Sequence, residues 1–432
     1  MYNYFGTDGI RGEYGKAVTE DIAYKLGAAL GENESVAVVG RDTRVSGESL
    51  LAAFAEGVWS QGGNVVNIGV LPTNAVAFFT RKLGADYGVM ISASHNPAAD
   101  NGLKVFDKYG IKICLTKQRE ISRKIDEKQN YSGSGSEPEL WGDAESLYLD
   151  DLFGKFDGLG GMEITLDLAH GAAYSAAPKI FEKLGARVTK LSSSPDGEKI
   201  NYRCGAATPE FLRSACRTEL GFAYDGDADR LAVVENGVII DNNRIFYAVA
   251  KYMEENKMLS RGIVVGTVLT NAGAENALMK IGLKLSRSEV GDIKIAERMN
   301  SLGVNLGGEE SGHYLVYDYA TSSDSVINSL LLANIVRKTG PISEYTKEMS
   351  LVKVSKMDFT VTDEQKRFIT ESNLIEKNLV KLAALFPETR TVLRLSGTEP
   401  KVRIFVEADE NAERVMEAAR ELFDEALTRI KS

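Results

Sequence analysis

A unit of alternating apolar runs and helical patterns, which occurs three times along the chain, constrains the fold more than any other feature of this sequence. In its first copy, apolar runs at 35–40, 63–68 and 87–92 are separated by helical patterns over 47–60 and 73–83. Short apolar runs that alternate with helices are typical of layered α/β domains with largely parallel strands. The pattern therefore predicts such a domain in the N-terminal part of the chain.

The same alternation returns twice in the middle of the chain. The second copy has expected strands at 162–167, 186–191 and 221–224, and the third has them at 262–266, 283–286 and 304–306, with helical patterns between them. Single hydrophobic cores stop growing at roughly 250–300 residues. A chain of 432 residues is therefore expected to divide into several domains.

The last part of the chain differs from the repeats. From about Lys356, a charged helical stretch precedes apolar runs at 391–394 and 402–406 and a terminal helical pattern from Asn411, which indicates a smaller domain. We therefore expect three similar α/β domains with mixed, largely parallel sheets and a C-terminal α+β domain around a central cleft. The expected bounds are 1–155, 156–255, 256–356 and 357–432.

Charge and cysteine content narrow the classes of partner and compartment. The formal net charge of −10 argues against a nucleic-acid partner, because phosphate backbones are bound by concentrated Lys and Arg. The three cysteines have no C-x-x-C spacing, which favours a reducing compartment. The sequence has no apolar N-terminal signal region and no apolar run near the roughly 20 residues of a membrane span. We expect a cytoplasmic protein without a membrane partner.

The third expected strand of each repeat ends in a loop of small, charged or hydroxyl-bearing residues. These loops are Ser92–Pro97, Asp225–Arg230 and Gly308–His313. Ligands of open α/β sheets collect beyond the carboxyl ends of the strands, so three equivalent loops can converge on one cleft.

The segment Asp225-Gly-Asp-Ala-Asp229 is the strongest chemical signal. Asp225, Asp227 and Asp229 occupy alternate positions and offer three hard oxygen ligands, which suit Mg²⁺. An EF-hand is excluded, because Arg230 stands where that loop needs glycine and Asn236 where it needs glutamate. The alternative is a solvated acidic turn.

The first loop contains a candidate nucleophile, Ser94, followed by His95. Pro97 disfavours helical geometry at the residue before it, which keeps the loop open. No G-x-S-x-G elbow surrounds Ser94, so a Ser-His-Asp hydrolase is not indicated. The alternative is a turn whose hydroxyls cap backbone groups.

Two further segments suit the rest of a phosphorylated sugar. The third loop carries Glu309, Glu310, Ser311 and His313, which offer partners for hydroxyl groups. His170 has no comparable context and is interpreted as structural. Candidates for an anion site near the C-terminus are Arg394, Ser396, Gly397, Thr398 and Arg403. Further candidates for phosphate contacts are Arg11, Arg41 and Arg44, although surface salt bridges explain these arginines equally well.

Taken together, the serine, acidic, sugar and Ser-Gly-Thr loops resemble the α-D-phosphohexomutase family, in the family order and over essentially the full chain. Within that family, the segments Tyr4–Gly12, Ile91–Pro97 and Val290–Asp292 are most similar to the phosphoglucosamine mutase subgroup. Two positions depart from that subgroup, which often has glutamine at position 310 and a polar residue at position 207, where this chain has Glu310 and Ala207. Glucosamine, glucose and mannose phosphates all stay open as substrates.

The resemblance implies a phosphosugar mutase that uses a phosphoserine and a sugar 1,6-bisphosphate intermediate. Ser94 would carry the phosphoryl group and would bind one Mg²⁺ together with the three aspartates. Glu309 and Ser311 would hold sugar hydroxyls, and the non-reacting phosphate would be held by Ser396, Thr398 and Arg403. Arg11 and Arg230 would neutralise the transferred group.

Several alternatives stay open at this point. The base that takes the proton of the sugar hydroxyl is Lys104, His95 or His313, and Lys104 would need a lowered pKa for this role. The first rival function is a phosphatase with Asp225 as nucleophile, and the second is a non-catalytic phosphosugar sensor. The protein is expected to be a monomer or a homodimer.

Overall fold

The N-terminal sheet is built on β2, which is apolar and buried except at its ends. The computed structural model describes residues 4–6, 8–133, 135–396, 400–408 and 410–428. In the N-terminal unit, β2 pairs in parallel with β3 and β4, and β5 pairs antiparallel with β4 and β1, in the order β1-β5-β4-β2-β3. Its elements are β1 (Ile10–Glu13), α1 (Glu20–Leu30), β2 (Val36–Arg41), α2 (Gly47–Trp59), β3 (Asn64–Val70), α3 (Thr73–Lys82), β4 (Tyr87–Ile91), β5 (Asp100–Asp107) and α4 (Leu115–Asp126).

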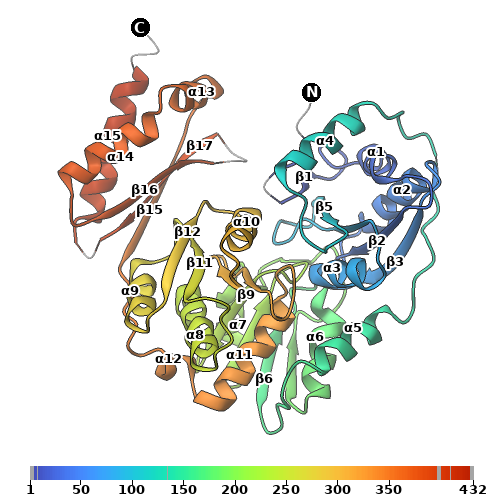
Figure 1. Cartoon of the computed structure of the whole chain (residues 1–432), viewed down its shortest axis with the longest axis horizontal. Coiled ribbons are helices and arrows are strands. Elements are labelled where there is room, and N and C mark those ends of the chain that lie inside the picture. The colour runs from blue at the N-terminus through green and yellow to red at the C-terminus, as the bar shows by residue number, and fades with distance from the viewer. Residues whose placement is uncertain (1–3, 7, 134, 397–399, 409, 429–432) are drawn as a thin grey trace.

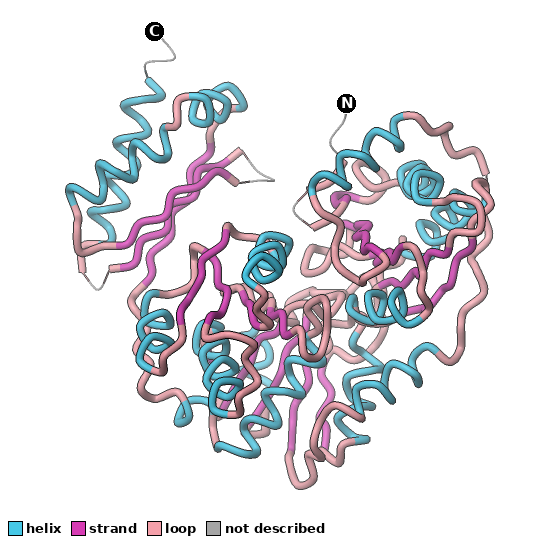
Figure 2. Tube along the Cα trace, viewed as in Figure 1, coloured by secondary structure: helices cyan, strands magenta, loops and turns pink. Residues whose placement is uncertain are grey.

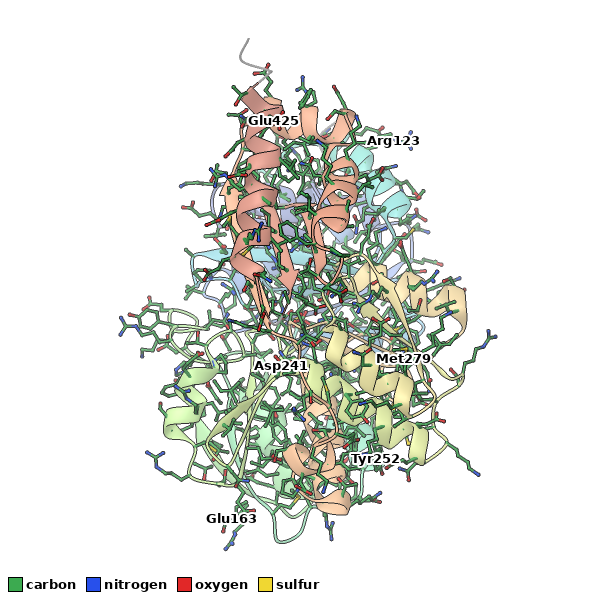
Figure 3. The ribbon with its side chains drawn as sticks, turned by 90° about the vertical axis from the view of Figure 1, so that its left-hand side faces the viewer. Arg123, Glu163, Asp241, Tyr252, Met279 and Glu425 are labelled. Carbon is green, nitrogen blue, oxygen red and sulfur yellow. The ribbon has the colours of Figure 1, made fainter. Side chains whose placement is uncertain are left out.

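The second unit repeats this arrangement with the order β10-β9-β8-β6-β7. Figure 3 shows Glu163, the first residue of β6, at the end of the molecule opposite Glu425 of the last helix, so that β6 runs inward. The elements are α5 (Ala144–Phe153), β6 (Glu163–Asp167), α6 (Ala173–Lys183), β7 (Arg187–Leu191), α7 (Pro209–Ala215), β8 (Leu220–Tyr224), β9 (Leu231–Glu235) and β10 (Val238–Ile240).

The third unit has the order β12-β11-β13-β14. In each of the three units a central strand lies between two parallel neighbours. The neighbour that comes later in the chain also pairs antiparallel with the strand that follows it. The elements of the third unit are α8 (Asn242–Glu255), β11 (Ile263–Thr267), α9 (Ala272–Lys280), β12 (Lys284–Ser288), α10 (Asp292–Leu302), β13 (Leu306–Gly308), β14 (Tyr314–Val316), α11 (Ser325–Thr339) and α12 (Ile342–Tyr345). The expected three similar α/β units with mixed sheets are confirmed.

The C-terminal unit is smaller and has an antiparallel sheet in the order β15-β17-β16. Figure 1 shows this unit in orange and red beside β11 and β12, with its helices on one face of the sheet. Its elements are β15 (Val354–Thr360), α13 (Asp363–Glu371), α14 (Leu374–Leu385), β16 (Arg390–Leu395), β17 (Lys401–Glu407) and α15 (Ala412–Thr428). The expected α+β architecture of this part is confirmed.

Packing joins the three α/β units more closely than the last one. A single cluster of buried apolar side chains runs from Val38 in the first unit through Phe222 to Leu331, whereas the C-terminal unit has its own cluster around Phe359 and Phe423. Helix α11 is buried along most of its length and contacts α6, α8, β8 and β14. A helix that is buried on all sides belongs to a core, so α11 holds the second and third units together.

Side-chain caps fix the starts of some of the helices. Asp324 accepts hydrogen bonds from the backbone N–H groups of Val326 and Ile327, and Thr362 begins a capping box with Gln365.

In the part of the chain that the structure describes, no helix has the combination of length and apolar composition that crossing a membrane requires.

Candidate active site

The loops that follow the last parallel strand of each α/β unit meet the C-terminal sheet around one cavity of about 610 Å³. Figure 2 shows loops gathered between the three α/β sheets. All four units contribute to the wall, so the cavity is the expected central cleft. Its titratable and hydroxyl-bearing residues are Asp8, Arg11, His95, Asp229, Arg230, Asp292, Glu309, Glu310, Ser311, His313, Arg394, Ser396 and Arg403.

Ser94 lies beside this cleft, shortly after the end of β4, and it is buried. Its backbone has a φ of 52°, a left-handed conformation that is uncommon for serine and persists only where surrounding contacts hold it. The hydroxyl donates a hydrogen bond of 2.6 Å to Oδ2 of Asp225 and lies 3.4 Å from Oδ1 of Asp229. The structure thus brings the candidate nucleophile and the acidic loop together.

Asp225, Asp227 and Asp229 are buried after β8, and one carboxylate oxygen of each lies within 4.8 Å of the others. The backbone N–H groups of Asp229 and Arg230 donate to Oδ1 of Asp225 at 3.1 and 3.0 Å. In the part of the chain that the structure describes, Oδ1 of Asp227 is buried and has no hydrogen-bond partner. An orphaned oxygen among three carboxylates fits a hard divalent cation.

The electrostatics of the acidic loop also favour a cation. Burial, together with the negative charges of Asp229 and Asp227, raises the pKa of Asp225 to about 7. Three ionised carboxylates therefore repel one another in this space, and a bound cation would relieve the repulsion.

Lys104 approaches the acidic loop from β5, whose antiparallel register places it opposite Met90 of β4. Its Nζ lies 2.6 Å from Oδ2 of Asp227, 2.8 Å from Oδ2 of Asp229 and 3.1 Å from Oδ2 of Asp8. Burial alone lowers the pKa of Lys104, but the three carboxylates outweigh burial and hold that pKa well above its ordinary value. Lys104 therefore lacks the lowered pKa that a general base requires.

The two candidate histidines differ in charge. Nδ1 of His95 lies 3.4 Å from Oγ of Ser94, and burial, assisted by Arg230 and Arg11, lowers the pKa of His95 to about 4. His313 lies with Nδ1 3.9 Å from Oδ1 of Asp229. Burial lowers the pKa of His313, but Asp229 outweighs burial and raises it. His95 is thus neutral near pH 7, whereas His313 is biased towards its cationic form.

Arg44 has a role that sequence reasoning left open, because a surface salt bridge explained it equally well. It is buried, and its guanidinium donates to the carbonyl oxygens of Ser94 at 3.0 Å, Asn96 at 2.8 Å and Asp100 at 2.8 Å, and also to that of Pro97. Nε donates to Oδ2 of Asp42 at 2.9 Å. All five N–H groups of the guanidinium are therefore engaged, and four of them hold carbonyl oxygens of the segment 94–100, which includes the serine loop. By contrast, Arg41 pairs with the exposed side chain of Glu48.

Gly226 allows the acidic loop to approach the serine loop. A Cβ atom at Gly226 would lie 2.5 Å from the carbonyl oxygen of Ser94, closer than side chains come to a backbone. Asn201 donates to the same oxygen at 2.8 Å and so joins the second unit to the serine loop. The contact between the two loops thus depends on the absence of a side chain at Gly226.

A second ionic cluster, which sequence reasoning missed, adjoins the acidic loop through the contact between Lys104 and Asp8. Lys112 donates to Oδ1 of Asp8 at 2.5 Å and also contacts Asp292 of α10, which joins the first and third units. Arg11 forms an ion pair with Asp8. Lys112 stands in a segment without periodicity, so only the tertiary fold reveals this cluster.

The sugar loop is a tight turn between β13 and β14. The N–H of Glu309 donates to the carbonyl oxygen of His313 at 2.9 Å, and the hydroxyl of Ser311 donates to Oε2 of Glu309 at 3.1 Å. Glu309, Ser311 and His313 all line the cleft, as the sequence predicts.

The anion-site candidates lie at the adjoining ends of β16 and β17. Arg394 and Arg403 are directly opposite each other in the sheet register, and Ser396 follows β16. All three line the cleft. Gly397 and Thr398 lie outside the described residues.

Comparison with protein families accounts for nearly the whole chain. The models described as phosphoglucomutase/phosphomannomutase alpha/beta/alpha domains I, II and III match residues 2–132, 147–237 and 241–351. The C-terminal domain model of the same family matches residues 357–425.

Individual relatives agree with this result. A phosphoglucosamine mutase of Clostridioides difficile (strain 630) is 40% identical over 431 residues, which cover 96% of each chain, and one of Staphylococcus aureus (strain NCTC 8325 / PS 47) is 38% identical over 445 residues, with the same coverage. A crystal structure of a phosphoglucomutase/phosphomannomutase family protein from Burkholderia thailandensis has the same fold, with a TM-score of 0.82 at 24% identity over 98% of this chain and 97% of that one. The chain therefore belongs to the phosphoglucomutase/phosphomannomutase family, the α-D-phosphohexomutases, and is a mutase, an isomerase.

Proposed function

We propose that this mutase interconverts glucosamine 6-phosphate and glucosamine 1-phosphate, with Ser94 as the carrier of the phosphoryl group. The observation that carries this proposal is the hydrogen bond between the Ser94 hydroxyl and Asp225 in a buried cluster of three carboxylates beside the cleft. The name phosphoglucosamine mutase, which the relatives at 38–40% identity carry, supports glucosamine as the sugar.

The family implies a metal cofactor, and the acidic loop fits one. We assign Mg²⁺, because carboxylate oxygens are its preferred protein ligands and it shares its coordination with phosphate. Asp225, Asp227, Asp229 and phosphorylated Ser94 would hold the ion, which would neutralise negative charge on the phosphoryl oxygens.

The proposed transfer proceeds in two steps. The phosphoryl group of Ser94 passes to the 1-hydroxyl of glucosamine 6-phosphate, which forms the 1,6-bisphosphate and leaves the Ser94 oxygen free. The 6-phosphoryl group then passes to Ser94, and glucosamine 1-phosphate is released. Both ends of the sugar must therefore reach Ser94 in turn, and the bisphosphate would also activate unphosphorylated enzyme.

Charge and proton transfer are assigned to different residues. Lys104, held as a cation by three carboxylates, together with Arg11 and Arg230, would neutralise the transferred group. His95 would accept the proton of the attacking hydroxyl, because its ring is neutral near pH 7 and lies 3.4 Å from Oγ of Ser94.

Residues that line the cleft would bind the remaining groups of the substrate. Glu309, Ser311 and His313 would hold sugar hydroxyls. The non-reacting phosphate would be held by Arg394, Ser396, Gly397, Thr398 and Arg403, because arginine forks match pairs of phosphate oxygens. The cytoplasmic location and the monomeric or homodimeric state stay predictions.

The test compares Ser94→Ala with Ser301→Ala, which alters an exposed serine at the end of α10. With Mg²⁺ and glucosamine 1,6-bisphosphate present, Ser94→Ala should abolish interconversion while Ser301→Ala keeps the wild-type rate. Full activity of Ser94→Ala would contradict the proposal. Net release of phosphate by the wild type would favour the phosphatase, and binding without turnover would favour the sensor.

A further inference from the structure

The backbone of the acidic loop is held by residues that lie outside the second unit. The carbonyl oxygens of residues 227, 228 and 229 accept hydrogen bonds from three donors. These are, in the same order, the N–H of Thr73 at 3.0 Å, the N–H of Ser325 at 2.8 Å and the hydroxyl of Ser323 at 2.7 Å. Thr73 begins α3 in the first unit, and Ser325 begins α11. The starts of two helices thus fix the shape of the loop.

The loop needs this support because its turn is strained. Ala228 stands between two of the aspartates with a φ of 58°, a left-handed conformation that is uncommon for alanine. Such a conformation costs about 1–3 kcal/mol and persists only where surrounding contacts hold it. The carboxylates of Asp227 and Asp229 are therefore presented together only while the outside residues hold the turn.

Thr73 contacts Asp227 through its side chain as well as its backbone. The Thr73 hydroxyl donates to Oδ2 of Asp227 at 2.6 Å, and Nζ of Lys104 donates to the same oxygen at 2.6 Å. These two bonds leave Oδ1, the buried oxygen without a partner, as the oxygen of Asp227 that is available to a cation. Thr73 is itself buried and is not among the described residues that line the cleft. It can therefore act on a bound group only through Asp227.

A buried carboxylate connects the two helix starts that hold the loop. Oδ2 of Asp324 accepts Nδ2 of Asn74 at 3.0 Å and also the hydroxyl of Tyr148, while Oδ1 caps α11. All of these donors are neutral, and among the described residues Asp324 forms no ion pair. Burial of a charge without a counter-charge is costly, so its hydrogen bonds must all be kept. Asn74 follows Thr73 directly, so this contact also fixes Thr73.

We propose that Thr73 is a positioning residue for the metal site, where its hydroxyl orients the carboxylate of Asp227 towards the bound cation. The inference rests on the metal cofactor of the proposed function. Hydrogen-bond partners of metal ligands fix the orientation of those ligands, and their loss costs about 10- to 100-fold in metal affinity. Lys104 cannot take over this role, because its ammonium group is shared among three carboxylates.

The test measures the dissociation constant of Mn²⁺ on the full chain by electron paramagnetic resonance, because Mn²⁺ prefers the same oxygen ligands as Mg²⁺. Thr73→Val removes the hydroxyl at nearly constant shape, and Thr73→Ser keeps it. Thr80→Val is the matched control, since it removes a buried hydroxyl of the same helix that donates to the carbonyl oxygen of Val76 at 2.7 Å. The constant should rise about 10- to 100-fold in Thr73→Val and stay close to the wild-type value in Thr73→Ser and Thr80→Val.

Activity gives a second readout that a merely structural role would not change. In Thr73→Val the half-saturating Mg²⁺ concentration should rise by the same factor as the Mn²⁺ constant. Saturating Mg²⁺ should restore most of kcat, with KM for glucosamine 6-phosphate close to wild type. If Thr73→Val and Thr80→Val both lower the Tm but leave both metal readouts unchanged, Thr73 is structural and the inference is wrong.

The outcomes also separate this inference from the function beneath it. If the wild type binds Mn²⁺ and Thr73→Val binds it equally tightly, the role of Thr73 is wrong and the mutase function stands. If the wild type binds Mn²⁺ without interconverting sugar phosphates, the proposed function fails while the Mn²⁺ constants still decide the role of Thr73. A wild type that binds no Mn²⁺ contradicts the metal assignment and this inference together. Thr73→Ala, which also lacks the hydroxyl, repeats the comparison if Thr73→Val does not fold.

Discussion

The hydroxyl of Ser94 and the carboxylate of Asp225 lie 2.6 Å apart, although 131 positions separate the two residues in the chain. Each follows the last parallel strand of its unit, so the repeated topology places both at the same edge of the molecule. Gly226 and Asn201 then bring the two loops into contact. The consequences for stability and for activity can be tested separately.

Asp225 should make the stability of the metal-free protein depend on pH. Its pKa is about 7 in the folded protein and ordinarily 3.8, so the folded state binds the proton more tightly than the unfolded state. The stability that protonation contributes is present below about pH 4 and is lost as the pH rises through about 7. Relative to Asp225→Asn, the free energy of unfolding of the wild type should therefore fall between these pH values.

Thermal or denaturant unfolding in the presence of a chelator measures this difference. Mg²⁺ should raise the Tm of the wild type more at pH 7 than at pH 5, because the ion replaces the proton that Asp225 loses. A difference between wild type and Asp225→Asn that stays constant across this range would contradict the assignment.

Lys104→Met should strongly destabilise the protein. The substitution leaves the carboxylates of Asp227, Asp229 and Asp8 without their buried cation, and the loss of one partner from a buried ion pair costs about 3–5 kcal/mol. Mg²⁺ should recover part of this loss. Lys16→Met removes an exposed cation that pairs with the exposed side chain of Glu13 and should change the free energy of unfolding by less than about 1 kcal/mol. Equal effects of the two variants would show that Lys104 is not coupled to the acidic loop.

Arg44→Lys should impair turnover more than substrate binding. A lysine ammonium cannot replace the four N–H groups that hold carbonyl oxygens of the segment 94–100, so Ser94 would lose its fixed position. Misplacement of a reacting group by about 1 Å costs about a hundredfold in rate. We expect kcat to fall about 10- to 100-fold with a smaller change in KM, whereas Arg41→Lys should be close to wild type. Steady-state kinetics of both variants decide between this role and a purely structural one, which would lower the Tm without changing kcat of the folded enzyme.

The central parallel strands of the α/β units could be predicted from the sequence because they are short, apolar and buried, as in β8, where every residue is buried. The antiparallel strands of these three units were not predicted. Strand β5 carries Lys104 and Asn101 at buried positions, which breaks the apolar pattern, and β14 has only three residues. Polar residues are tolerated inside β5 because each finds a partner there: Lys104 pairs with the acidic loop and with Asp8, and Asn101 donates to Ser46 before α2.

The residues of the candidate site also divide into those that the sequence predicts and those that only the structure reveals. Ser94 and the three aspartates follow predictable strands and stand in recognisable motifs. The contacts of Arg44 with the serine loop and of Lys112 with Asp8 and Asp292 join segments that are 50 to 180 positions apart, and an isolated cation has no local signature. The charge of Lys104 also required the structure, because the carboxylates that raise its pKa come from two distant loops.

The central claim, that Ser94 carries the phosphoryl group, is tested most directly by locating that group on the protein. The wild type is incubated with Mg²⁺ and phosphorus-labelled glucosamine 1,6-bisphosphate, digested, and mapped by tandem mass spectrometry. We expect one labelled phosphoserine, Ser94, whose label passes to product when glucosamine 6-phosphate is added. A hydroxylamine-sensitive acyl phosphate on Asp225, or label that stays on Ser94 without transfer, would contradict it.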